Sequence, residues 1–176
     1  MNLRLFGAVA AAIIALNPAP ATAQARFGVA SGLNLPTSTL SDAADAGYNA
    51  AVSVDLGAHL PVGLKFEGAY NGFQLKRDGG DVRIISGTAN AVFNVGRENN
   101  SPYLIAGLGA YNRRLNLNPF GISDDKTVVG INGGGGLRFP LGGLTTFFEA
   151  RYHVMLGNAN EATNYQFIPI TFGIVF

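Results

Sequence analysis

The sequence contains no cysteine and no tryptophan, and only 13% of its 176 residues are charged. The missing cysteines exclude disulfide bridges, thiolate metal ligands and a lipidated cysteine, although they do not identify the compartment. The formal net charge is +1, and it falls to zero if Arg4 is removed with an N-terminal leader. A neutral chain has no long-range field that attracts nucleic acid, so we expect no nucleic-acid partner.

The first residues have the features of a secretory signal peptide. Arg4 precedes an apolar run over residues 5–16, which is followed by an Ala-Thr-Ala triplet of small residues. The run is shorter than the ~20 residues that a membrane-spanning helix needs. We therefore predict a signal peptide over residues 1–23, cut after Ala23 or, alternatively, after Ala25, and export from the cytoplasm.

Beyond this leader, apolar residues recur with period two, which is typical of strands with two unlike faces. Val52 and Val54, for example, alternate with Ser53 and Asp55. No later stretch approaches the ~18 uninterrupted apolar residues that indicate a transmembrane helix. The pattern predicts one domain over residues 24–176 with eight strands, at 26–35, 47–58, 63–74, 83–94, 103–113, 127–139, 145–156 and 165–176.

The links between these strands alternate between short and long. The short links are HLPV, VGRENNSP and PLGGL, and the longer ones include PTSTLSDAADA and RLNLNPFGISDDK. This layout is typical of outer-membrane barrels, whereas a soluble barrel with an apolar lumen is the alternative. Lipid supplies no hydrogen bonds to the backbone, so strands cross it only in a closed sheet. Together with the leader, this favours an all-β, eight-stranded antiparallel up-and-down transmembrane β-barrel with both chain ends in the periplasm.

Placing the apolar face in lipid turns six charged residues of the polar face into lumen residues. They lie near the short-link ends of their strands: Asp55, Lys65, Glu67, Arg138, Glu149 and Arg151. The third and seventh strands of such a barrel face each other across a lumen that side chains can fill. Because a buried charge without a partner costs several kcal/mol, we predict a hydrogen-bonded ion network that plugs the lumen. The alternative is that these charges simply face water.

Four segments, GVASGLNLPTSTLSD, YLIAGLGAY, FFEARYHV and FIPITFGIVF, resemble the small outer-membrane β-barrel domain proteins. These are the eight-stranded group related to the OmpA transmembrane domain, OmpX and the opacity proteins. The resemblance implies that the barrel-assembly machinery reads the apolar residues at alternate positions of the last strand, which here are Ile168, Ile170, Phe172, Ile174 and Phe176. Pro169 interrupts the hydrogen bonding of this strand, which predicts a bulge and leaves its register open.

Candidate catalytic residues are few. His59 lies beside a short link, and His153 has no nearby serine on its strand face, whereas hydrolysis needs a nucleophile beside an oriented base. Two separate histidines do not make a zinc site, and the loop acids lack the spacing of a calcium loop. We therefore expect no enzyme activity, no cofactor and no metal site.

Basic residues at the outer strand ends are candidates for contact with lipopolysaccharide phosphates: Lys76, Arg77, Arg113 and Arg114. The alternative is that these bases only keep the loops soluble. We expect a monomeric integral outer-membrane protein of a Gram-negative-type bacterium with a structural or surface-interaction role, such as membrane integrity or adhesion, whose loops bind an extracellular ligand. A narrow porin-like channel for small solutes or ions and, more distantly, a lipid-modifying outer-membrane enzyme are the alternatives.

Overall fold

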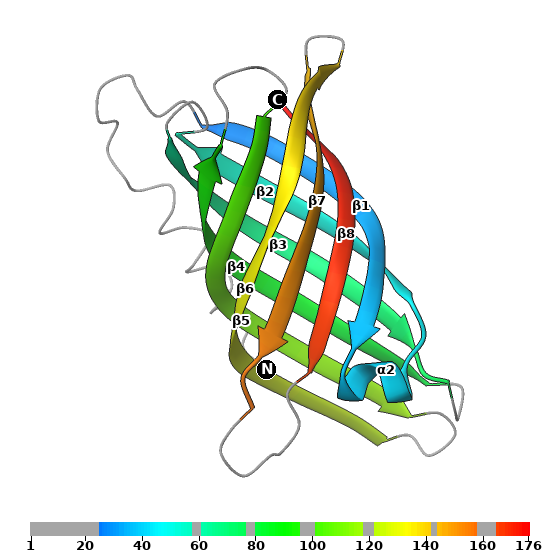
Figure 1. Cartoon of the computed structure of the whole chain (residues 1–176). Coiled ribbons are helices and arrows are strands. Elements are labelled where there is room, and N and C mark those ends of the chain that lie inside the picture. The colour runs from blue at the N-terminus through cyan, green and yellow to red at the C-terminus, as the bar shows by residue number, and fades with distance from the viewer. Residues whose placement is uncertain are drawn as a thin grey trace.

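The computed structural model describes residues 25–57, 61–76, 80–95, 101–117, 122–141, 144–157 and 165–176. The described chain forms eight strands and one short helix: β1 (Arg26–Thr37), α2 (Thr39–Ala43), β2 (Gly47–Leu56), β3 (Val62–Gln74), β4 (Asp81–Asn94), β5 (Ser101–Leu117), β6 (Ile122–Leu141), β7 (Leu144–Met155) and β8 (Gln166–Val175). Each strand pairs antiparallel with the next in sequence, and β8 pairs with β1 to close the barrel (Figure 1). Within the described ranges, no helix is long and apolar enough to cross a membrane. The predicted fold class is confirmed.

The period-two pattern decides which side chains point into the barrel. In β4, Ser86 and Thr88 point inward and are buried, whereas Ile85 points to the outer face and is 49% exposed. The same division holds around the barrel, where large apolar side chains such as Leu104 and Phe172 cover the outer surface. Apart from an apolar cluster near α2, the inner surface carries mainly amides, hydroxyls and charges, whereas a soluble barrel would have an apolar lumen.

The two ends of the sheet close on each other at the chain termini. The backbones of Phe27 and Phe176 exchange two hydrogen bonds of 2.9 Å, and the β1–β8 pairing continues from there to Thr37. We call this end of the barrel the terminal end and the opposite end the α2 end. Figure 1 shows α2 at the end of the barrel away from the C-terminus.

The bulge predicted at Pro169 is not found. The β7–β8 pairing is interrupted between Ala150↔Ile170 and His153↔Phe167, but its offset is the same on both sides of the gap. Proline lacks the N–H that the ladder needs at this position, so hydrogen bonding is lost locally. Continuous pairing of Pro169 with β1 fixes the register of the strand.

β5 and β6 are longer than the sequence predicts, and most of the expected loop at 114–126 is a continued strand pair. They pair from Ser101↔Arg138 to Leu117↔Ile122, whereas β7 pairs with β6 only from Gly130 onward. The outer part of this hairpin is held by polar cross-strand contacts, such as Arg114 Nη2 to Asp125 Oδ2 at 2.9 Å. Polar residues therefore continued the sheet where the sequence pattern indicated a loop.

Candidate functional site in the barrel lumen

Four charged side chains form a buried ion network across the lumen. Lys65 and Glu67 come from β3, whereas Glu149 and Arg151 come from β7 on the opposite wall. Lys65 Nζ lies 3.4 Å from Oε2 of Glu67 and 3.4 Å from Oε2 of Glu149. Arg151 Nη2 contacts Oε1 of Glu67, and its Nε lies 2.8 Å from Oε1 of Glu149. Each base therefore contacts both acids, and the side chains are only 2–5% exposed.

Aromatic side chains complete the surroundings of this network. The hydroxyl of Tyr103 in β5 donates to Oε2 of Glu149 at 2.7 Å. Lys65 Nζ lies 4.5 Å from the ring centroid of Phe147, a cation–π contact. Gly136 is the cross-strand partner of Tyr103, and a Cβ on it would lie 2.5 Å from the tyrosine oxygen. The absence of a side chain at Gly136 thus makes room for the Tyr103 hydroxyl.

The other two predicted network residues lie apart from these four. Arg138 donates from Nη1 to Oδ1 of Asn94 at 2.7 Å, and its guanidinium lies 4.5 Å from the ring centroid of Tyr103. Asp55 is the cross-strand partner of Lys65 and is 4% exposed, but its Oδ1 has no hydrogen-bond partner among the described residues. Asp55 and Arg138 line the same small hollow near the terminal end of the lumen. The structure thus brings four of the six charges into ion pairs and leaves this acid and this base nearer the mouth.

Between the ion network and the α2 end lies a layer of His153, Tyr111 and Asn132. Nδ1 of His153 and the hydroxyl of Tyr111 are 2.9 Å apart, and the imidazole stacks on Phe167 with ring centroids 5.0 Å apart. Asn132 pairs with His153 across β6 and β7 and donates to Oδ1 of Asn90 at 2.9 Å. Nε2 of His153 and Oδ1 of Asn132 lack hydrogen-bond partners within the described part of the chain. His153 thus packs as a lumen residue, whereas His59 lies outside the described residues.

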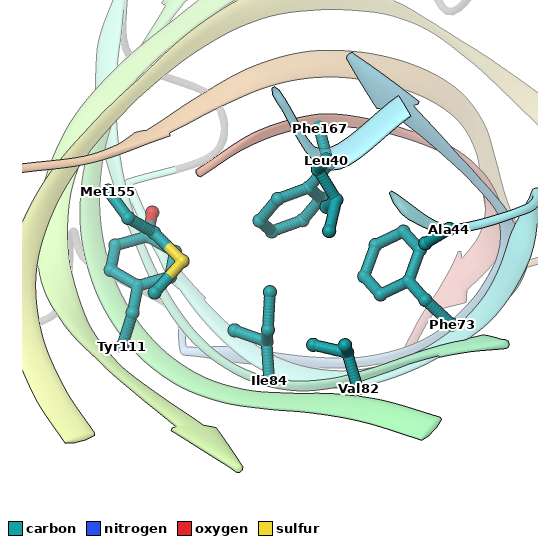
Figure 2. Close-up of a cluster of buried hydrophobic side chains, with 8 residues drawn as sticks. All are labelled: Leu40, Ala44, Phe73, Val82, Ile84, Tyr111, Met155 and Phe167. Atoms are coloured by element: carbon teal, nitrogen blue, oxygen red, sulfur yellow. The ribbon is translucent and has the colours of Figure 1, made fainter. Parts of the chain in front are cut away.

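An apolar cluster lies at the α2 end of the lumen. It combines Leu40 and Ala44 of the α2 segment, by which we mean residues 38–45, with side chains from five strands: Phe73, Val82, Ile84, Tyr111, Met155 and Phe167. Figure 2 shows these side chains pointing toward one another inside the ring of strands. Leu40, Ile84 and Phe167 are fully buried. The lumen is therefore occupied by charged, then polar, then apolar side chains along its length.

The basic residues predicted at the outer strand ends have different surroundings. Lys76 donates from Nζ to the backbone oxygen of Ser41 at 2.7 Å. Arg113 shares its strand face with the buried Tyr111, and its Nη1 donates to the hydroxyl of Tyr165 at 2.5 Å. Arg77 lies outside the described residues.

Arg114 takes the opposite face of the sheet from Arg113. On this face its cross-strand partner is Arg83, which the sequence pattern did not indicate. Arg83 Nε lies 2.6 Å from Oδ2 of Asp81. Arg83 and Arg114 have about half of their side chains exposed, at 51% and 45%. The outward-facing basic pair is thus Arg83 and Arg114.

The last strand presents its predicted apolar stripe outward. Phe172 is 49% exposed and Phe176 is 61% exposed, while the alternate positions Phe167 and Thr171 are buried. The three isoleucines of the stripe lie beside outward-facing residues of β1, at Val29↔Ile174, Leu33↔Ile170 and Leu35↔Ile168. An assembly role for this stripe stays a prediction.

Within the described ranges, no group of three or more histidine, aspartate or glutamate side chains is placed to hold a metal ion. The ion network offers only two carboxylates, and both already accept from Lys65 and Arg151. The network is therefore suited to a structural role, because each charge is neutralised by neighbours within the protein.

The comparisons with known proteins agree with this architecture. The sequence matches the outer membrane protein beta-barrel domain family over residues 6–176. The chain belongs to this family. The barrel is therefore an outer-membrane barrel, with its apolar side chains on the outer surface. A search of curated proteins gives no significant match.

Solved structures of other outer-membrane barrels share the fold of this protein. Neisserial surface protein A (NspA) is 18% identical with a TM-score of 0.67, over 87% of this chain and 97% of that chain. The N-terminal β-barrel domain of Pseudomonas aeruginosa OprF is 15% identical with a TM-score of 0.55, over 88% and 99%. Ail, the attachment invasion locus protein of Yersinia pestis, is 18% identical with a TM-score of 0.53, over 87% and 99%. At these identities the likeness shows the fold alone, and none of these names describes an enzyme.

Proposed function

We propose that this outer-membrane protein has a structural or surface-interaction role and that its lumen is plugged. The observation that supports this most is the succession of barriers inside the barrel. The ion network ties β3 to β7, and the apolar cluster closes the α2 end. An eight-stranded barrel has a lumen just wide enough for side chains to fill it.

The proposal places the α2 end outside the cell, with the long β5–β6 hairpin extending from it as a surface for contact. NspA is named as a surface protein and Ail as an attachment invasion locus protein, and one structure of Ail contains the heparin analogue sucrose octasulfate. A role in adhesion or membrane integrity, with an extracellular ligand bound through the loops of a monomer, is consistent with that placement. Export by a cleaved signal peptide and insertion by the barrel-assembly machinery of a Gram-negative-type cell belong to the same proposal.

Contact with lipopolysaccharide phosphates is assigned to a revised set of bases in this proposal. Arg83 and Arg114 share the outward face of adjacent strands, and Arg83 lies beyond the lipid-facing Ile85. Guanidinium groups at this level can donate hydrogen bonds to phosphate oxygens. Arg113 is less suited, because its side chain is directed to Tyr165 on the inner face.

A narrow channel for small solutes or ions is the second candidate, and single-channel recording in planar bilayers separates it from the first. We expect the purified barrel to give no steady conductance steps. Steady steps that disappear when Glu67 or Arg151 is replaced by alanine would overturn the plugged lumen and favour the channel. Arg114→Ala, on the outer surface, is the matched control and should leave the recordings unchanged.

A lipid-modifying activity is tested separately by the mass of lipid A from cells that overproduce the protein. We expect the mass spectrum to match that of cells without the protein, because His153 packs against Tyr111 and Phe167 rather than beside a serine nucleophile. A lipid A species that appears only with the intact protein would contradict this expectation.

A further inference from the structure

The α2 segment covers the end of the lumen through two buried side chains. Leu40 is 0% exposed and Ala44 is 1% exposed, and both belong to the apolar cluster. In Figure 2, Ala44 lies on the Phe73 side of the cluster and Leu40 on the Phe167 side. The segment therefore spans the mouth and is seated by apolar contact with the strands below it.

The polar attachments of α2 are all on one side. Asp45 N donates to Gln74 O at 2.9 Å, Lys76 N donates to Ala43 O at 3.0 Å, and Lys76 Nζ donates to Ser41 O at 2.7 Å. Ala44 also forms an isolated antiparallel bridge with Leu75. Within the described residues, the backbone bonds from this segment to the neighbouring chain thus go to positions 74–76, at the end of β3 and just beyond it. On the Phe167 side the segment is held by Leu40 in the apolar cluster.

The helix has little stability of its own. It is five residues long, and helices shorter than ~12–15 residues are marginal in water without tertiary contacts. The side chain of its N-cap residue Ser38 makes no capping hydrogen bond, although the Ser38 backbone oxygen accepts from Ser41 N at 3.0 Å. Ser38 also has a φ of 54°, a conformation that non-glycine residues rarely adopt. Besides its short chain links to β1 and β2, its docked position thus depends on the apolar contact of Leu40 and on the attachments to 74–76.

We infer that α2 is a hinged lid, attached beside β3 and latched by Leu40, whose opening gives solutes from outside the cell access to the upper lumen. Undocking exposes the apolar cluster and then the layer of His153, Tyr111 and Asn132. The ion network lies below this layer, so an open lid alone does not make a conducting pore. The lid and the network are separate barriers with different chemistry.

A thiol placed under the lid tests this inference, because the chain has no cysteine of its own. Val82→Cys puts one nearly volume-conserving thiol in the cluster, at a position that is 2% exposed. The barrel is folded into lipid vesicles, and the rate of modification by a small charged methanethiosulfonate is measured. Asp42→Cys, on the exposed side of the same helix, gives the rate of a freely accessible thiol.

With the native lid, we expect the Val82→Cys thiol to react much more slowly than the Asp42→Cys thiol. Adding Leu40→Ala should accelerate its modification by about 30-fold, the factor that corresponds to about 2 kcal/mol of lost leucine burial at 1.4 kcal/mol per tenfold. Leu40→Met keeps the side-chain volume and should restore a slow rate. Ala43→Ser changes an exposed lid residue and should have little effect.

Equal rates for Leu40→Ala and the native lid would overturn the inference, as would a Val82→Cys thiol that reacts as fast as Asp42→Cys. If the Leu40→Ala barrel does not fold in vesicles, Leu40→Val removes less volume and should accelerate labelling to a smaller extent. Conductance of the Leu40→Ala barrel separates this inference from the proposed function. Fast labelling without conductance supports both barriers, and fast labelling with conductance supports the lid but contradicts the plug. Unchanged labelling contradicts the lid alone.

Discussion

At the scale of single residues, the ion network depends on the size of the side chains in the wall around it. Tyr103 reaches Glu149 because its cross-strand partner Gly136 has no Cβ in the way. Gly136 belongs to a run of four glycines at 133–136 in β6, which alternate between the inner and the outer face. Substitution should therefore have different effects at inner and outer positions. Gly133 points outward, where an added Cβ would approach nothing closer than 3.8 Å.

We predict that Gly136→Ala destabilises the folded barrel by ~1–3 kcal/mol, the usual cost of overpacking a filled interior. The added methyl group would lie 2.5 Å from the Tyr103 hydroxyl oxygen and 2.5 Å from the backbone oxygen of Phe148. Tyr103 must therefore move, which breaks its bond to Glu149. Urea unfolding in lipid vesicles measures the change in the free energy of unfolding. Gly133→Ala is the matched control, with an expected change within ~1 kcal/mol. Equal effects of the two substitutions would show that the space beside Tyr103 does not matter.

The outer hairpin contains a charge pair whose pH dependence can be predicted. Hydrogen bonds donated by Arg114 and Asn112 lower the pKa of Asp125 below its ordinary value of 3.8. A lowered carboxyl pKa stabilises the fold above the unfolded-state pKa, and the contribution is lost as the pH falls through the folded-state value. We expect the Asp125 carboxyl signal in nuclear magnetic resonance to titrate below pH 3.8, and Arg114→Met to return it toward that value. An unshifted pKa in the native protein would contradict the pairing.

At the scale of elements, period-two alternation was sufficient to predict eight strands and the inward direction of the four paired charges. It underestimated β5 and β6, because polar residues in water can continue a sheet without an apolar face to reveal it. It gave no sign of α2, since a single helical turn seated by Leu40 is too short to show a helical period. It also missed Tyr103, because both faces of YLIAGLGAY are apolar or glycine and the pattern there does not separate inside from outside.

The alternation of inward and outward positions along a strand, here called strand parity, does not predict which side chains contact each other. Parity placed Asp55 and Arg138 on the inner face correctly, yet their positions along the barrel leave them outside the ion pairs. Parity also places Arg113 and Arg114 on opposite faces of β5, so these neighbours in the sequence do not form one basic site. Only the register between strands shows that Arg83 is the partner of Arg114 on the outward face.

The terminal strand provides a prediction about biogenesis. If the assembly machinery reads its apolar stripe, Phe176→Ala should lower the amount of barrel in the outer membrane more than it lowers the stability of the refolded protein. Phe27→Ala is the matched control, because Phe27 is also outward-facing and bonds to Phe176 at the same end of the barrel. Quantitative immunoblotting of outer-membrane fractions measures the yield. Unchanged yield with Phe176→Ala would contradict the assembly role.

At the scale of the whole molecule, the barrel combines an outward-facing apolar surface with four paired charges inside the lumen. Burying four charges is costly, and the cost is offset only because each base contacts both acids and Tyr103 adds a further hydrogen bond. The network also connects strands on opposite walls, which adjacent-strand pairing alone does not do. In the proposed function, the same four side chains both block the lumen and connect its opposite walls.

A double-mutant cycle between β3 and β7 tests this central claim most directly. The free energies of unfolding in vesicles are measured for Glu67→Gln, Arg151→Met and the double variant. We predict a loss of ~3–5 kcal/mol for Arg151→Met alone, because two buried acids then share Lys65 as the one remaining base of the network. The double variant should be less destabilised than the sum of the two changes by ~1 kcal/mol or more. Asp125→Asn combined with Arg151→Met is the distant control and should be additive within ~0.5 kcal/mol. Additive effects of Glu67→Gln and Arg151→Met would contradict a coupled network across the lumen.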